Sequence, residues 1–365
     1  MKVCKRCVLP QTYPGIEFDE EGTCNYCNNS REKEISAPAD PFDNEQQLIE
    51  CMEKIKKTGG KYDVLVPLSG GIDSCNALIT IVEKFKLKAL GFHNDHGYED
   101  EVATDNVKKL CKQLDVDLVI MQQDLLFMKK LWKYVNESDE GLNSCYVCGN
   151  ILYINALEVA DKFNISLVIN GYSKGQAAMM SDKDCASVSL EKMIKVIEKT
   201  GDKAFFYEFM DKYKILQKKK DYQTRDDLEM GLEPGKILVV PFYVFDFYKT
   251  DKEALIKEVQ KLFDWQPMPT SYPARTTNCE MIWLNTYMDR KKMGYSLYEI
   301  EYSELIRKGE MTRQQVLTDL EFNPPAQLIQ RLAHEIGVDI KLFKKENQST
   351  GAGTENETVN IEFDF

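Results

Sequence analysis

The sequence has little histidine, an excess of acidic over basic residues, and no long apolar run. It contains three histidines, and 59 acidic against 47 basic residues give a formal charge of −12. So few imidazoles leave little room for catalysis that depends on histidine. The acidic balance makes a nucleic-acid partner unlikely, because such a surface needs many lysines and arginines. No apolar stretch reaches the roughly 18 residues of a membrane span, and no signal segment is evident. We therefore expect a cytoplasmic protein with no membrane partner.

Eleven cysteines stand out against this background. In a reducing compartment, they favour metal ligation or free thiols over disulfides. Two C-x2-C pairs, Cys4/Cys7 and Cys24/Cys27, are separated by about 16 residues, a spacing typical of structural zinc sites. Four thiolates would close a tetrahedral site, so we predict one structural zinc ion (Zn2+) there. Four unligated thiols are the alternative.

The most informative segment is the run Ser-Gly-Gly-Ile-Asp-Ser at 69–74, between an apolar strand-like stretch and a helix-like one. The glycines let the backbone approach a ligand closely, and the N–H groups and dipole of the helix favour an anion. No lysine follows the glycines, so this is not a Walker A loop. We predict a phosphate-binding loop, and a tight turn without a ligand is the alternative. Its binding residues would be Leu68, Ser69, Gly70, Gly71, Asp73 and Ser74.

Alternating strand-like and helix-like segments predict an α/β fold with a doubly wound parallel sheet. We expect strands at 62–68, 88–93, 116–121, 167–169 and 237–241. Helices are expected at 44–57, 73–86, 99–114, 151–162 and 251–263, and within 295–340. We divide the chain into a zinc-binding module (1–32), a phosphate-loop core (58–185), a helical insertion (186–230), a region that completes the core and continues as helices (231–345), and a flexible tail (346–365).

Polar residues follow the expected strands at their carboxyl ends, where parallel sheets bind ligands. Those after the second strand would lie near the adenine or ribose of a nucleotide, and Asp95 could also help to hold Mg2+. A polar loop with capping roles is the alternative. Two later cations are candidates for binding phosphate or a sugar carboxylate, unless they are surface charges. These residues are His93, Asn94 and Asp95, then Asn170 and Gly171, and the cations Lys174 and Arg275.

A third C-x2-C pair, Cys145 and Cys148, has no second pair after it. Single cysteines follow at Cys185 and Cys279. Two cysteines and one distant cysteine make a poor zinc site, but they could bind a 4Fe-4S cluster that keeps one open iron position. A second zinc ion and plain thiols are the alternatives. Cys185 competes with Cys279 as the third ligand.

The loop Ser-Gly-Gly-Ile-Asp-Ser resembles the pyrophosphate loop of the PP-loop ATPases, which split ATP between its α and β phosphates. The ordered set CKRCVLP, CNYC, VPLSGGIDS, HNDHG, NSCYVCGN, NGYSKGQ and YPARTTNC is similar to the N-acetyl sugar amidotransferase family of surface-polysaccharide and nonulosonic-acid biosynthesis. This resemblance runs from Cys4 to about residue 345. It implies a PP-loop fold, ATP and Mg2+, and conversion of a sugar acetamido group to an acetamidino group. The catalytic set would then be Ser69, Asp73, Ser74, Lys174 and Arg275.

The resemblance also implies partners. The substrate would be an N-acetylated sugar, free or nucleotide-linked. Ammonia would come from separate glutaminase and cyclase-like subunits, because Lys2 stands where an N-terminal-nucleophile glutaminase needs cysteine.

PP-loop tRNA 2-thiolation enzymes are the alternative family. They bind a 4Fe-4S cluster through a C-x2-C pair and a later cysteine, which Cys145, Cys148 and Cys279 match. The negative charge and the lack of a C-terminal C-x2-C pair count against thiolation. A nucleotide-binding regulator with a zinc module is a third possibility.

Overall fold

The computed structural model of the 365-residue chain describes residues 2–33, 45–56, 60–171, 190–218, 237–241, 252–274 and 278–340. Its centre is a five-stranded sheet of order β3-β2-β1-β4-β5, in which all neighbouring strands are parallel. The strands are β1 (Val64–Pro67), β2 (Ala89–Asp95), β3 (Asp117–Gln122), β4 (Leu167–Asn170) and β5 (Leu238–Pro241). The predicted parallel sheet is confirmed, with each expected strand in place.

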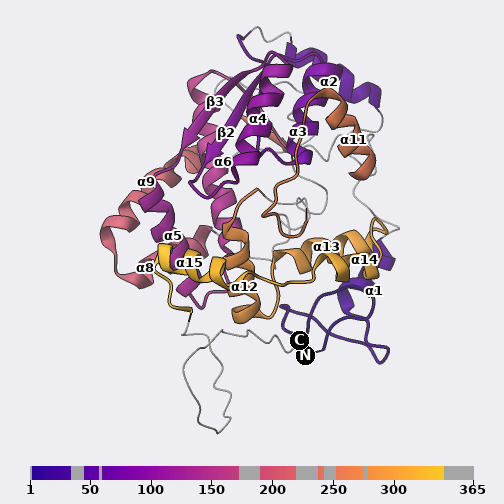
Figure 1. Ribbon diagram of the computed structural model, residues 1–365, viewed down its shortest axis with the longest axis vertical. Helices are drawn as coiled ribbons and strands as arrows, with labels where there is room; N and C mark the ends of the chain where they lie inside the picture. The colour runs from indigo at the N-terminus through magenta and orange to yellow at the C-terminus, as the bar shows by residue number, and fades with distance from the viewer. Residues whose placement is uncertain are drawn as a thin grey trace.

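Helices cover both faces of the sheet (Figure 1). Along β1, Val64 and Val66 point to one face and Leu65 points to the other, as the two-residue period of a strand requires. Burial on both sides explains why β1 is a continuous apolar run. The first face packs on α2 (Glu45–Lys56), α3 (Ile72–Ile79), α4 (Glu101–Gln113) and α11 (Lys252–Leu262), and the second on α6 (Ser144–Lys162). The sheet is therefore doubly wound.

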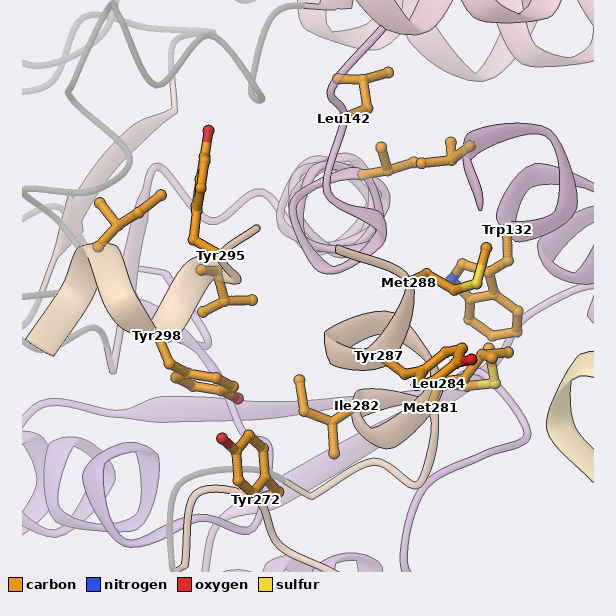
Figure 2. Packing of buried hydrophobic residues seen from close by; sticks show 14 of the residues in the cluster. Trp132, Leu142, Tyr272, Met281, Ile282, Leu284, Tyr287, Met288, Tyr295 and Tyr298 are labelled. Atoms are coloured by element: carbon orange, nitrogen blue, oxygen red, sulfur yellow. The ribbon is translucent and has the colours of Figure 1, made fainter. Parts of the chain in front are cut away.

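Further helices form a second body of the molecule next to the sheet (Figure 1). Its core includes the fully buried side chains of Leu131, Leu284 and Met288, with Trp132 almost as deeply buried (Figure 2). The helices are α5 (Leu125–Glu137), α8 (Leu190–Thr200), α9 (Lys203–Lys218), α12 (Met281–Met293), α13 (Leu297–Arg307), α14 (Arg313–Asp319) and α15 (Ala326–Ile336).

The N-terminal segment, which includes α1 (Asn25–Lys33), packs against α13 and α14. The Val8 N–H donates to Ser303 Oγ at 3.2 Å, and Arg313 Nε donates to the carbonyl of Cys7 at 3.0 Å. The ring of Tyr13 meets that of Tyr295 edge-to-face at 5.3 Å. The cysteine module therefore shares a hydrophobic core with these helices.

Some expectations need correction or stay open. Helix α6 begins at Ser144 rather than near residue 151, and α5 and α12 were not expected. Lys174, Cys185, Arg275 and the tail 346–365 lie outside the described residues. The proposed module boundaries stay predictions, although α8 and α9 are helical within the segment expected as an insertion. None of the described helices has the length and apolar character of a membrane span.

Candidate functional site

The loop between β1 and α3 is held in shape by its own two serines. Ser74 Oγ accepts the N–H of Ser69 at 3.2 Å and donates to the carbonyl of Gly71 at 3.0 Å. Ser69 Oγ in turn accepts the N–H of Gly71 at 3.3 Å. Gly71 is the N-cap of α3, and as a glycine it has no side chain to cap the first turn of the helix. The first turn of α3 is therefore available to an anion such as a phosphate group.

Close contacts explain two glycines at this site, Gly70 in the loop and Gly171 after β4. Gly70 has a φ of +76°, and a Cβ there would collide with the backbone of Ala103 on α4. Its carbonyl accepts hydrogen bonds from Asn106 Nδ2 at 3.2 Å and from Trp265 Nε1 at 3.0 Å. After β4, a Cβ on Gly171 would lie 2.6 Å from the Cα of Ser74. The loop is thus fixed from two sides, as a preformed binding site requires.

A cavity of about 320 Å³ opens in front of this loop. It lies between the carboxyl edge of the sheet and the helices α6, α12 and α13. The cavity brings together most of the residues predicted from the sequence. From those predictions, the wall takes Leu68, Ser69, Gly71, Asp73, Ser74, Asn94, Asn170, Gly171, Cys145, Cys148 and Cys279.

Among the described residues that were predicted for the loop and the sheet edge, three do not line the cavity. Gly70 belongs to the loop but packs against Ala103 of α4. His93 is buried, with Nδ1 at 2.8 Å from the Leu68 carbonyl and Nε2 at 3.1 Å from Thr104 Oγ1. The His93 side chain therefore contacts the backbone at the end of β1, where the loop begins. The carboxylate of Asp95 accepts the Gly97 N–H at 2.8 Å and Gln122 Nε2 at 3.3 Å. Nucleotide contacts by these side chains stay predictions.

The four N-terminal cysteines lie close enough together that they could hold one metal ion. The Sγ atoms of Cys4 and Cys27 are 3.9 Å apart, and those of Cys7 and Cys24 are 3.8 Å apart. A tetrahedron with Zn–S bonds of about 2.3 Å has edges of about 3.8 Å. The backbone N–H groups of Arg6, Cys7 and Cys24 donate to Cys4 Sγ at 3.3–3.4 Å. The four buried thiols therefore fit a structural zinc ion.

The four thiols differ in their pKa values. Hydrogen bonds from Cys24 and Cys27 lower the pKa of Cys7 to about 6, and hydrogen bonds within the same group lower the pKa of Cys4. A zinc ligand must be a thiolate, so a lowered pKa favours binding near neutral pH. The pKa values of Cys24 and Cys27 are raised instead. Hydrogen bonds with Cys4 and Cys7, together with burial, favour the protonated form of these two thiols.

The second set of cysteines has a different geometry. Cys145, Cys148 and Cys279 all line the cavity, but their sulfur atoms do not fall within 4.8 Å of one another, as the first set does. A single zinc ion needs closer sulfurs. Burial raises the pKa of Cys148 to about 12 and that of Cys145 well above its usual range.

Two asparagines position Cys145. The Cys145 N–H donates to Asn143 Oδ1 at 2.8 Å at the start of α6. Asn285 Nδ2 on α12 donates to the sulfur of Cys145 at 3.3 Å. An amide that donates to sulfur stabilises the thiolate form and is a common outer contact of metal-bound cysteine. Neither asparagine could be identified from the sequence, because α12 and the first turns of α6 were not expected.

The sequence interpretation also missed a buried pair, His96 and Glu99. His96 Nε2 lies 2.9 Å from Glu99 Oε1, and the two side chains are 4% and 7% exposed. The other carboxylate oxygen of Glu99 accepts Asn278 Nδ2, which also donates to the carbonyl of Ser69 at 2.9 Å. Both residues line the cavity. His96 was noticed only as part of a polar loop, and nothing in the local sequence singles out Glu99.

Charge and polarity of the cavity come from a few groups. Asp73, Glu99 and Glu301 contribute carboxyl groups to its wall. Two wall residues, Asn94 and Trp132, carry buried nitrogens (Nδ2 and Nε1) without a hydrogen-bond partner within the described part of the chain. Such donors usually find a partner in a ligand or an ordered water. The rest of the wall is largely apolar, so the cavity suits a small polar ligand with an apolar or planar part.

Comparisons with known proteins give distant likenesses. No protein-family model matches the chain. An uncharacterized protein from Methanocaldococcus jannaschii is 26% identical over 217 residues, which are 59% of this chain and 72% of that protein. A GMP synthase (glutamine-hydrolyzing) from Pyrobaculum aerophilum is 25% identical over 121 residues, 33% of this chain and 24% of that enzyme.

Among solved structures, the U34-tRNA thiolase NcsA from Methanococcus maripaludis, with its 4Fe-4S cluster, covers 90% of this chain and 96% of its own, at 15% identity and a TM-score of 0.34. An NH3-dependent NAD synthetase from Campylobacter jejuni covers 59% of this chain and 95% of its own, at 16% identity and a TM-score of 0.29. Because these TM-scores are low, we assign the fold from the order and direction of the strands in this chain's own sheet. The sheet order defines a doubly wound α/β protein in which α3 begins directly after β1.

Proposed function

We propose that the protein is an ATP-dependent amidotransferase that converts the acetamido group of an N-acetylated sugar to an acetamidino group, with AMP and pyrophosphate as the other products. The observation that carries the ATP-using part is the β1–α3 loop. The first turn of α3 faces the cavity at the carboxyl edge of the parallel sheet. The choice of a sugar amide rests on the ordered motifs from CKRCVLP to YPARTTNC.

The reaction needs two steps. The amide oxygen attacks the α-phosphorus of ATP, the bond between the α-phosphorus and the bridging oxygen breaks, and pyrophosphate leaves. Ammonia then adds to the amide carbon, loses a proton, and the carbon–oxygen bond to AMP breaks to give the amidine. The N–H groups at the start of α3 would stabilise the departing pyrophosphate. Asp73 lies in the first turn of α3 and on the cavity wall, and under this proposal its carboxylate would help to hold the Mg2+ that accompanies ATP.

Several features support a small substrate. The cavity is within the size range of small-molecule sites, and three carboxyl-bearing residues line it. Carboxylates repel a polynucleotide backbone but suit ammonium and the cationic amidine product. The partial likeness to a glutamine-hydrolyzing GMP synthase is consistent with nitrogen transfer. Under this proposal, separate glutaminase and cyclase-like subunits supply the ammonia.

The test is a product analysis. The protein is incubated with ATP, Mg2+, an ammonium salt and a panel of N-acetylated nucleotide sugars. We expect AMP and pyrophosphate by ion-exchange chromatography and exchange of the amide oxygen for NH by mass spectrometry. Ser69→Ala and Asp73→Ala should abolish AMP formation, whereas Ser138→Ala, remote from the cavity, should not. ADP and phosphate as products would refute the adenylation mechanism.

Sulfur transfer to tRNA is the second candidate, and one observation favours it. Cys145, Cys148 and Cys279 face the same cavity as the loop. Thiolation would also consume ATP to AMP and pyrophosphate, so the nucleotide products do not separate the two reactions. Incubation with tRNA and a sulfide source, followed by nucleoside analysis, does. We expect no thiolated nucleoside, and its appearance would replace the amidotransferase proposal.

A further inference from the structure

Trp132 differs from the other two tryptophans of the chain in its hydrogen bonding. The indole N–H groups of the others donate to backbone carbonyls, Trp265 to Gly70 at 3.0 Å and Trp283 to Thr270 at 2.9 Å. The Nε1 of Trp132 is buried and has no hydrogen-bond partner within the part of the chain that the structure describes. The side chain is 1% exposed and lines the cavity. Because a buried indole N–H usually has an acceptor, we expect a bound ligand to supply it.

Asn285 offers the opposite polarity to the same cavity. Its Nδ2 donates to Cys145 Sγ at 3.3 Å, whereas its buried Oδ1 has no partner among the described residues. Asn285 is 2% exposed and belongs to the cavity wall. The wall therefore holds one donor and one acceptor that no described protein group satisfies. Leaving such buried groups unpaired is unfavourable, so a ligand that pairs with both is favoured.

Both groups come from the junction of α5 and α12. Trp132 on α5 and Leu284 on α12 belong to one buried cluster (Figure 2). Asn285 directly follows Leu284 on α12. One turn earlier on the same helix, Met281 and Ile282 also line the cavity. This part of the wall thus combines a donor, an acceptor and apolar side chains.

We propose that Trp132 and Asn285 bind the acetamido group of the substrate, an inference that rests on the proposed function. A secondary amide has a carbonyl oxygen that accepts and an N–H that donates, which complements an indole N–H and a carboxamide oxygen. A carboxylate has no donor for Asn285, and an ammonium group has no acceptor for Trp132. A hydroxyl group could pair with both, but it has no apolar part to contact Met281 and Ile282, as the methyl of an acetamido group has.

The position of this amide subsite relative to the β1–α3 loop suits the reaction. His96 packs edge-on against Trp132, with ring centroids 5.5 Å apart, and its Nε2 lies 2.9 Å from Glu99 Oε1. Glu99 accepts Asn278 Nδ2, which also donates to the Ser69 carbonyl at 2.9 Å. A chain of contacts therefore joins the subsite to the loop. Because a carbonyl oxygen has two lone pairs, one can accept from Trp132 while the other attacks the α-phosphorus of ATP.

The three indole N–H groups supply both the measurement and its controls. The full chain with 15N-labelled tryptophan gives three indole resonances by nuclear magnetic resonance, and Trp132→Phe and Trp283→Phe assign them. The probes are N-methylacetamide and the panel of N-acetylated nucleotide sugars. Methyl acetate, which lacks the N–H, and ethanol, which has a hydroxyl instead of an amide, are the comparisons.

We expect the amides to shift the Trp132 resonance downfield, because its N–H gains an acceptor. The resonance of Trp283, which is not part of the described cavity wall, should not move. Trp265 should respond to ATP instead, since its acceptor Gly70 belongs to the loop. Methyl acetate and ethanol should bind about 2- to 10-fold more weakly than N-methylacetamide, as expected for one missing hydrogen bond or a missing apolar contact.

Two variants of Asn285 test its acceptor. Asn285→Asp keeps an acceptor oxygen and should keep the preference for amide over ester, whereas Asn285→Leu should lose it. Trp132→Phe keeps an aromatic ring and should weaken amide binding by about 2- to 10-fold in ligand-detected titrations. Unchanged resonances of Trp265 and Trp283 show that each variant is folded.

A Trp132 resonance that no amide moves would overturn the proposal, and so would an Asn285→Leu variant that still prefers amide over ester. Equal affinity of the wild type for N-methylacetamide, methyl acetate and ethanol would also overturn it. These outcomes are separate from turnover. Conversion of an N-acetylated sugar while the Trp132 resonance stays in place would refute the subsite alone. A shifted resonance without AMP formation would support the subsite and refute the amidotransferase reaction.

Discussion

At the scale of single residues, Gly70 shows how the sequence determines the shape of the loop. Its φ of +76° is one that residues with a Cβ rarely adopt, and α4 approaches so closely that a Cβ would meet backbone atoms of Ala103. Backbone cannot rotate away as a flexible side chain can. The Gly-Gly motif was therefore predictable as a special turn, but the closeness of α4 was not, because it depends on the fold.

Gly70→Ala should lower the free energy of unfolding by more than the roughly 1–3 kcal/mol typical of overpacking, since backbone strain adds to the clash. Gly149 on α6 is the matched control. A Cβ there meets nothing within 4 Å. Gly149→Ala should leave stability unchanged or raise it by about 0.5–1 kcal/mol, as expected for glycine replaced in a helix. Urea denaturation of both variants makes the comparison, and equal stability of the two would contradict this account.

At the scale of elements, α4 clamps the loop to the segment that follows α11. Asn106 is 1% exposed, and its Nδ2 donates both to the Gly70 carbonyl at 3.2 Å and to the Gln266 carbonyl at 2.8 Å. Its Oδ1 accepts the Gln266 N–H at 3.1 Å. One side chain thus joins three parts of the chain that are separate in sequence. The loop keeps its position because α4 does.

Asn106→Ala should cost about 1–3 kcal/mol for each buried group that loses its partner, most of all at Gln266. It should also weaken ATP binding, because the Gly70 carbonyl then keeps only the bond from Trp265. Calorimetric unfolding and ATP titration measure the two effects. Asp105→Ala, an exposed neighbour on the same helix, is the control and should leave both unchanged. Unaltered ATP affinity in Asn106→Ala would show that the loop does not need the clamp.

How much the sequence predicts differs between elements. Helix α4 was predictable because its apolar positions recur at helical spacing on one face. The first two turns of α6 were not, since Ser144, the two cysteines and Gly149 are weak helix formers and tertiary packing decides their conformation. The loop and sheet-edge residues of the site follow from the order of strands alone. The His96–Glu99 pair is local, but the backbone bridge from Glu99 to Cys279 depends on long-range pairing, which no local pattern contains.

At the scale of the whole molecule, the cysteine module and the cavity are connected through α13. The module contacts α13 and α14 through Ser303 and Arg313, and α13 carries Tyr298 and Glu301 on the cavity wall. Arg307, on the same helix, is paired with Glu304, and its pKa is raised by that pairing and by the charge of Cys7 and Cys27 despite burial. Zinc in the module should therefore stabilise the cavity, although it is not part of it.

Removal of zinc tests this connection. We expect one zinc ion per chain by elemental analysis, and its release by a chelator or by Cys7→Ser should lower the main thermal transition of the whole chain. The physical reason is that Val8, Leu9 and Tyr13 belong to the same buried core as Tyr295 and Leu297, so the module cannot unfold without exposing that core. ATP should raise the transition temperature less in the zinc-free protein than in the zinc-bound one. A separate early transition, with the main one unmoved, would show instead that the module folds independently of the rest of the chain.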